Sequence, residues 1–157
     1  MRFLDDMTVG AITSFGRYEV TADEIVEFAS QYDNQPFHTD PEAAKHSLFG
    51  GLIASGWHTC AMMMRMVVDN AIGTEPSATL ASPGFDDLRW FTPVRPGDVL
   101  SVRSEILEVT PSRSKPDRGS VRIRNQILRQ DGEVVAELIS IAIMLRRNAA
   151  PQSQLNA

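Results

Sequence analysis

The sequence predicts an α+β domain in which one long apolar helix packs against an antiparallel β-sheet. Three observations support this prediction. Apolar residues recur at helical spacing between residues 55 and 70. In the second half of the chain, apolar residues alternate with polar ones, which is the period of a half-buried strand. The pair Asp131-Gly132 marks a tight hairpin, and a hairpin joins antiparallel strands.

Size and charge limit the classes of protein that the chain can belong to. It has 157 residues, 43% hydrophobic and 22% charged, as in an ordinary globular domain. We expect residues 1–147 to form one domain and residues 148–157, which lack apolar periodicity, to form a disordered tail. The net charge of -5, with basic and acidic residues intermixed, argues against a nucleic-acid partner.

The distribution of apolar residues and cysteine indicates the compartment. The apolar run Cys60–Met64 is ended by Arg65, far short of the roughly 20 residues of a membrane span, so we expect no membrane association. Cys60 is the single cysteine and can form neither an internal disulfide nor a cysteine-based zinc site. The opening residues Met1–Asp6 lack the pattern of a secretion signal. We therefore expect a reducing, cytoplasmic location and no metal site.

The first half of the chain carries signals for two short helices. Thr21, followed three residues later by Glu24, fits a capping box, and the helix should run to about Tyr32. The segment 34–36 breaks this helix, because proline moves the preceding residue out of the helical region. Pro41 suits the first turn of a second short helix.

The long helix and the strands after it leave apolar surface to be covered. The helix, from about Ser55 to Asn70, is apolar nearly all round, which predicts burial in the middle of the domain. Strands are expected around 100–106 and 121–124, and Val134–Leu145 should be an interior strand because it is apolar on both faces. Either the sheet curls around the helix, or a second subunit supplies the remaining cover.

Reactive side chains are densest in the break between the two short helices. Asp33 and His38 are five residues apart, so they are not neighbours on a helix, but a chain turned by Pro36 can direct both toward one water. The structural alternatives are that Asp33 caps the helix after Pro36, or that His38 is a half-buried histidine with its hydrogen bonds satisfied. The pair by itself does not decide between them.

A second candidate feature lies where small residues lead into the long helix. Backbone N–H groups in a first helical turn have no acceptor within the helix, and Gly56 has no side chain in the way. Such a helix start can bind a carbonyl oxygen as it becomes an oxyanion. The alternative is that Gly56 serves tight packing or capping.

Three segments in the same order resemble the MaoC-type acyl dehydratases and (R)-specific enoyl-CoA hydratases. They are Asp33-Asn34-Gln35-Pro36-Phe37-His38-Thr39-Asp40-Pro41, Phe49-Gly50-Gly51-Leu52-Ile53-Ala54-Ser55-Gly56 and Phe91-Thr92-Pro93-Val94-Arg95-Pro96-Gly97-Asp98. The resemblance covers nearly the whole chain. It implies a hot-dog fold, in which an antiparallel sheet wraps around a long central helix and two such sheets pair in a dimer.

The resemblance also assigns roles to residues. The family's catalytic aspartate falls on Asp33, its catalytic histidine on His38 and its oxyanion glycine on Gly56, and we expect Ser55 beside it to bind substrate. The chain departs from the family pattern at two places. Gln35 stands where asparagine is common, and Ser55 stands where many relatives have histidine.

The resemblance implies reversible hydration of 2-enoyl thioesters to (R)-3-hydroxyacyl-CoA, with coenzyme A as part of the substrate and no separate cofactor. A carrier-protein thioester is an alternative substrate, and a homodimer or higher homo-oligomer is expected. Two other functions are a hot-dog thioesterase and a non-catalytic acyl-CoA-binding or subunit-pairing module. Spacing selects none of the candidate residues for the coenzyme A phosphates, which are Arg89, Arg95, Arg113, Lys115 and Arg118.

Overall fold

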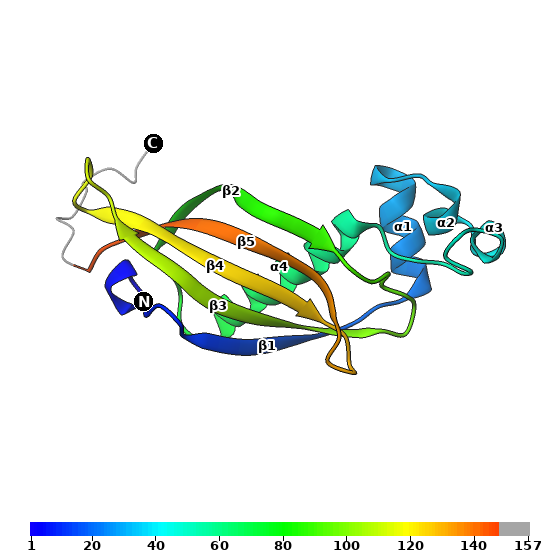
Figure 1. Ribbon diagram of the computed structural model, residues 1–157, viewed down its shortest axis with the longest axis horizontal. Helices are drawn as coiled ribbons and strands as arrows, with labels where there is room; N and C mark the ends of the chain where they lie inside the picture. Colours follow the sequence, from blue (N-terminus) through cyan, green and yellow to red (C-terminus); the bar gives the residue numbers. More distant parts are fainter. Residues whose placement is uncertain (148–157) are drawn as a thin grey trace.

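One long helix, α4 (Gly56–Gly73), lies along the inner face of a five-stranded antiparallel sheet (Figure 1). The computed structural model describes residues 1–147, and the expected tail, 148–157, lies outside the described residues. The strand order is β1-β3-β4-β5-β2. The strands are β1 (Ile12–Glu19), β2 (Thr79–Trp90), β3 (Val99–Pro111), β4 (Arg118–Leu128) and β5 (Val134–Leu145). This is the arrangement expected of a hot-dog fold.

Three shorter α-helices, α1 to α3, lie beyond one end of the sheet (Figure 1). A short 3₁₀ helix at Leu4–Asp6 precedes β1. Helix α1 (Ala22–Tyr32) begins after Thr21, whose hydroxyl accepts the N–H of Glu24. The expected capping box is only half formed, because the Glu24 carboxylate accepts a hydrogen bond from the partly buried Tyr18 hydroxyl instead. A partly buried hydroxyl needs a hydrogen-bond partner, and the Glu24 carboxylate serves Tyr18 in this way instead of bonding to the backbone at the helix start.

A one-turn helix, α2 (Pro36–Thr39), follows where the sequence predicts only a break. Pro36 ends α1 as expected, but it also occupies the first position of α2, where its missing N–H costs nothing. Helix α3 (Pro41–Lys45) follows directly, and the Asp40 carboxylate accepts two of its free N–H groups. His38 therefore lies on a helical turn rather than in a loop.

Both edge strands, β1 and β2, are absent from the sequence prediction. The pairing of β1 with β3 shifts register between Phe15 and Tyr18, where Gly16 adopts a φ of +81°. The pairing of β2 with β5 shifts register three times, and Asp87 has a φ of +53°. These irregularities interrupt the alternation that reveals a strand in a sequence.

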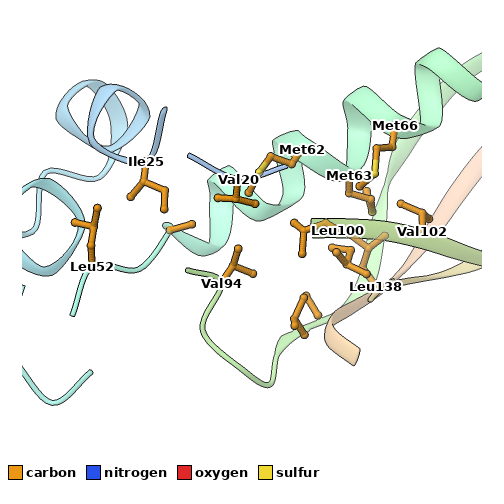
Figure 2. Close-up of a cluster of buried hydrophobic side chains, with 14 of the residues drawn as sticks. Val20, Ile25, Leu52, Met62, Met63, Met66, Val94, Leu100, Val102 and Leu138 are labelled. Carbon is orange, nitrogen blue, oxygen red and sulfur yellow. The ribbon is translucent and has the colours of Figure 1, made fainter. Parts of the chain in front are cut away.

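The core lies between α4 and the inner face of the sheet (Figure 2). Met63 and Met66 point from the helix toward the strands of the sheet that carry Leu100 and Leu138, and Met62 lies beside Val20. All three methionines are buried. Full burial of such side chains stabilises the fold by about 1.5–3 kcal/mol each. The interior position predicted for β5 is confirmed, since it pairs with β4 on one side and β2 on the other.

The expectation that α4 is buried nearly all round is wrong for a single protomer. Trp57 and Met64 are 54% and 53% exposed, and Val68 is also exposed. Among residues 1–147, no helix covers the outer face of β5 either. Ile139 and Ile141 there pair in register with Arg124 and Arg122, and the aliphatic stems of arginines can cover apolar neighbours. Within residues 1–147, no helix is long and apolar enough to cross a membrane.

Candidate active site

Asp33 and His38 converge at the junction of α1 and α2. Asp33 ends α1, and His38 lies on α2, so the turn at Gln35 controls their separation. The Gln35 N–H donates to the Asp33 carbonyl at 2.7 Å, and the Gln35 carbonyl accepts from the His38 N–H at 2.8 Å. The turn brings Oδ2 of Asp33 to 3.4 Å from Nε2 of His38. Of the two structural alternatives, capping of α2 by Asp33 does not occur, because no side chain caps that helix.

The ring of His38 is held by the backbone. His38 is 5% exposed, and its Nδ1 lies 2.7 Å from the carbonyl oxygen of Ile53. A carbonyl oxygen only accepts hydrogen bonds, so Nδ1 carries a proton and Nε2 is the lone-pair nitrogen of the neutral ring. Phe37 packs edge-on against the ring at a centroid distance of 4.5 Å. When the ring is neutral, the lone pair of Nε2 therefore faces the Asp33 carboxylate.

Both oxygens of the Asp33 carboxylate accept hydrogen bonds. The Ser55 hydroxyl donates to Oδ2 at 2.6 Å, and the Gln35 amide donates to Oδ1 at 2.7 Å. The Ser55 hydrogen bond, followed by that of Gln35, holds the pKa of Asp33 below its ordinary value, because both donors stabilise the ionised form. Asp33 is thus a carboxylate at neutral pH.

The start of α4 lies beside this carboxylate. Ser55 is fully buried, and besides binding Asp33 its oxygen accepts the N–H of Trp57 as the cap of α4. Gly56 follows, and the indole Nε1 of Trp90 donates to its carbonyl at 3.0 Å. A Cβ on Gly56 would lie 2.4 Å from Cε2 of Trp90. Gly56 is therefore in a tightly packed position as well as at a helix start.

A cavity of about 370 Å³ joins these features. Its wall is mainly apolar, and Asp33 and His38 supply two of its few polar side chains, as in many small-molecule sites. Ser55, expected to bind substrate, does not line it. The lining residues are Asp33, Phe37, His38, Phe49, Ile53, Ala54, Gly56, Trp57, Thr59, Trp90, Phe91, Thr92, Pro93 and Val94. In the described part of the chain, no group of three or more His, Cys, Asp or Glu residues is placed to hold a metal ion.

Two cavity residues, Trp90 and Thr59, were not predicted from the sequence, and Gln35 was identified only as a departure from the family pattern. The structure shows that Gln35 contacts Asp33. No local signal identifies Trp90, because its contact with Gly56 joins residues 34 positions apart. The signal for Gln35 was present, since it lies between the two reactive residues.

Residues 9–127 match the family model described as the MaoC like domain. Over 114 residues, the chain is 29% identical to the 3-hydroxybutyryl-CoA dehydratase of Methylorubrum extorquens, covering 72% of this chain and 69% of that protein. It is 30% identical to the uncharacterised protein YdeM of Bacillus subtilis over 112 residues, 71% of this chain and 78% of that one.

Solved structures give the same result. The MaoC-like dehydratase of Rhodospirillum rubrum is 44% identical with a TM-score of 0.84, over 94% of this chain and 99% of that one. The R-hydratase PhaJ1 of Pseudomonas aeruginosa, at 23% identity, shares the fold with a TM-score of 0.65, over 99% of this chain and 94% of that one. The fold is thus the hot-dog fold of MaoC-like dehydratases, and the chain belongs to the MaoC-like domain family.

Proposed function

We propose that this protein catalyses the reversible hydration of 2-enoyl thioesters to (R)-3-hydroxyacyl thioesters, with Asp33 and His38 as the acid-base pair. One observation carries the proposal. Two hydrogen-bond acceptors, Oδ2 of Asp33 and Nε2 of His38, lie 3.4 Å apart on the wall of an apolar cavity. One water molecule can donate one hydrogen to each of them, which turns its oxygen lone pair toward the cavity.

The chemistry follows from that placement. The water oxygen forms a bond to the β-carbon of the enoyl group while the pair removes one of its protons. A proton returns from the pair to the α-carbon on the same face, so the elements of water add across the double bond. The hydrogen bond from Nδ1 of His38 to Ile53 keeps the ring in the tautomer that this step needs. The (R) configuration is adopted from the family relationship.

Gly56 is the proposed charge stabiliser. As water adds, negative charge gathers on the thioester oxygen, and N–H groups at a helix start are suited to bind it. Gly56 begins α4 and lines the same cavity as Asp33 and His38. Ser55, fully buried under Asp33, acts in this proposal by holding the carboxylate and the helix start, and not by touching substrate.

The proposed substrate is an acyl-CoA, supported by the relative named as a 3-hydroxybutyryl-CoA dehydratase. Among the basic candidates, the position of Arg95 favours it as the partner of the coenzyme A phosphates. Its guanidinium donates to the carbonyl of Phe49, which lines the cavity. Arg113 and Lys115 belong to the β3–β4 turn at the opposite end of the sheet from α1 (Figure 1), and Arg118 pairs with Asp117.

Hydration of crotonyl-CoA tests the function. Loss of the enoyl absorbance without release of free thiol is the expected result. Release of thiol would identify a thioesterase, and saturable binding of the ester with neither reaction would identify a non-catalytic module. A panel of enoyl-CoA esters of increasing length then gives the preferred chain.

We also propose that the protein forms a homodimer. Trp57 and Met64 of α4 are exposed apolar side chains, and the edge strand β2 exposes Phe85 and Trp90. The rings of Trp57 and Trp90 meet edge-on at 5.5 Å and join the two elements into one surface. A second copy would cover this surface and also protect the free edge of β2.

A further inference from the structure

The two residues between Asp33 and the proline of α2 behave differently. Asn34 and Gln35 are both exposed, yet Gln35 is the one whose side chain is recorded in contact with the Asp33 carboxylate. Its Nε2 lies 2.7 Å from Oδ1 of Asp33. An ionised carboxylate only accepts hydrogen bonds, so the amide NH₂ of Gln35 must be the group that faces it.

The two oxygens of the Asp33 carboxylate have different partners. Oδ1 is occupied by Gln35, whereas Oδ2 binds the Ser55 hydroxyl and faces Nε2 of His38. A carboxylate held by Ser55 alone could still rotate about the bond to its β-carbon. A second donor, on the opposite oxygen, opposes that rotation and keeps Oδ2 directed at the histidine.

The backbone of Gln35 performs a separate task. Its N–H and carbonyl bind the main chain of Asp33 and of His38, so the turn is maintained whatever side chain is present. A side chain of similar size that has no hydrogen-bond donor would therefore remove the contact with the Asp33 carboxylate and leave the turn in place. This separation makes the side chain testable.

We propose that Gln35 is a positioning residue, whose amide holds the Asp33 carboxylate so that Oδ2 stays aligned with Nε2 of His38. The proposal rests on the acid-base role of Asp33 in the proposed hydration. Gln35 replaces the asparagine common in the family, and its longer side chain supplies the donor in this chain. The hydrogen bond from Gln35 is also the second-largest cause, after that of Ser55, of the lowered pKa of Asp33.

The first test needs no turnover. The carboxyl carbon of Asp33, labelled with ¹³C, is titrated by NMR in the wild type and in Gln35→Met, which is close in size but has no donor. The pKa of Asp33 should be higher in Gln35→Met than in the wild type, and higher still in Gln35→Glu, which adds a negative charge beside it. Asn34→Ala is the matched control from the same turn and should titrate like the wild type.

The second test is kinetic. In Gln35→Met, kcat for hydration should fall about tenfold while KM changes little, since a misplaced catalytic group costs rate more than binding. The acid limb of the kcat/KM profile should move to higher pH, because loss of a donor raises the proton affinity of the coupled pair. A purely structural role would lower the amount of folded enzyme without moving that limb.

The outcomes separate this inference from the proposed function. An Asp33 titration that is the same in Gln35→Met as in the wild type, or a shift of equal size in Asn34→Ala, would overturn the inference even if hydration is observed. A raised pKa in Gln35→Met in a protein that fails to hydrate any enoyl ester would support the contact with Asp33 and reject the hydratase function.

Discussion

Gly56 is the position at which packing and catalysis can be separated by a pair of substitutions. In Gly56→Ala, the added methyl would lie 2.4 Å from Cε2 of Trp90 and 2.8 Å from two other ring atoms. Carbon atoms in ordinary contact are about 3.5–4.0 Å apart, so the indole must retreat by roughly 1 Å or more. The retreat also strains the hydrogen bond from the indole to the Gly56 carbonyl.

The expected loss of stability follows from this contact. Overpacking typically costs about 1–3 kcal/mol. Trp90 is 45% exposed and can move outward in part, so we expect the lower half of that range, about 1–2 kcal/mol. For a chain of this length, that loss lowers Tm by roughly 2–8 °C.

To separate a catalytic role of Gly56 from its packing role, the substitution must also be made in a variant that lacks the Trp90 ring. Alanine at position 56 keeps the backbone N–H, but its methyl group would push the thioester oxygen away from that N–H. If Gly56 binds this oxygen, kcat should therefore fall by up to about 10²–10³-fold, the cost typical of losing one oxyanion donor. The displaced Trp90 also lines the cavity, so Gly56→Ala alone does not distinguish an oxyanion role from a packing role. In the Trp90→Leu background the clash with the ring is removed, and Gly56→Ala should cost little further stability.

The assay is hydration of crotonyl-CoA and thermal unfolding of four proteins: the wild type, each single variant and the double variant. With an oxyanion role, the double variant has a kcat far below that of Trp90→Leu alone, although the two melt at similar temperatures. If the double variant is as active as Trp90→Leu, Gly56 is a packing residue and the proposed charge stabiliser is wrong.

Further predictions concern the acid-base pair, a buried histidine and the oligomeric state. Asp33→Asn and His38→Ala should each lower kcat by about 10²–10⁴-fold, and the double mutant should be little worse than the worse single mutant, since both groups serve one water. Near wild-type hydration in either variant would reject the mechanism. His58 is 5% exposed, stacks on Phe28 at 4.7 Å and has no recorded hydrogen-bond partner for Nδ1 among the described residues, and burial lowers its pKa below 6.5. The unfolded chain then binds the proton more readily, so the free energy of unfolding should fall as the pH drops below about 6.5. Urea unfolding of His58→Phe, which retains the ring stacking, should show a weaker fall, and parallel curves for the two proteins would contradict this account. Light scattering should give twice the 17.4 kDa mass of one chain, whereas a folded monomer at micromolar concentration would exclude the homodimer. Arg95→Gln should raise KM for crotonyl-CoA but not for the N-acetylcysteamine ester, which has no phosphates. An equal rise for both esters would indicate that Arg95 only supports the Phe49 backbone.

Local patterns were sufficient for the regular parts of the fold. Helix α1 and strand β5 begin and end close to where the Thr21 cap and the Asp131-Gly132 hairpin place them, since these signals lie in neighbouring residues. The bulged edge strands β1 and β2 were missed because register shifts remove the alternation. Helix α2 was missed because Pro36 was interpreted only as the end of a helix, although it also begins one.

Local sequence is enough to place Asp33 and His38 on either side of one short turn, to put a small-residue segment at the start of the long helix, and to show that these motifs together resemble one family. How these groups face one another depends on tertiary contacts. Ser55 reaches Asp33 across 22 residues, and Ile53 orients His38 across 15. Such contacts depend on where α1 and α4 pack relative to each other, and no spacing along the chain encodes that distance. The exposed face of α4 could not be predicted from the sequence either. An apolar residue gives the same sequence pattern whether it is covered by its own chain or by a second copy.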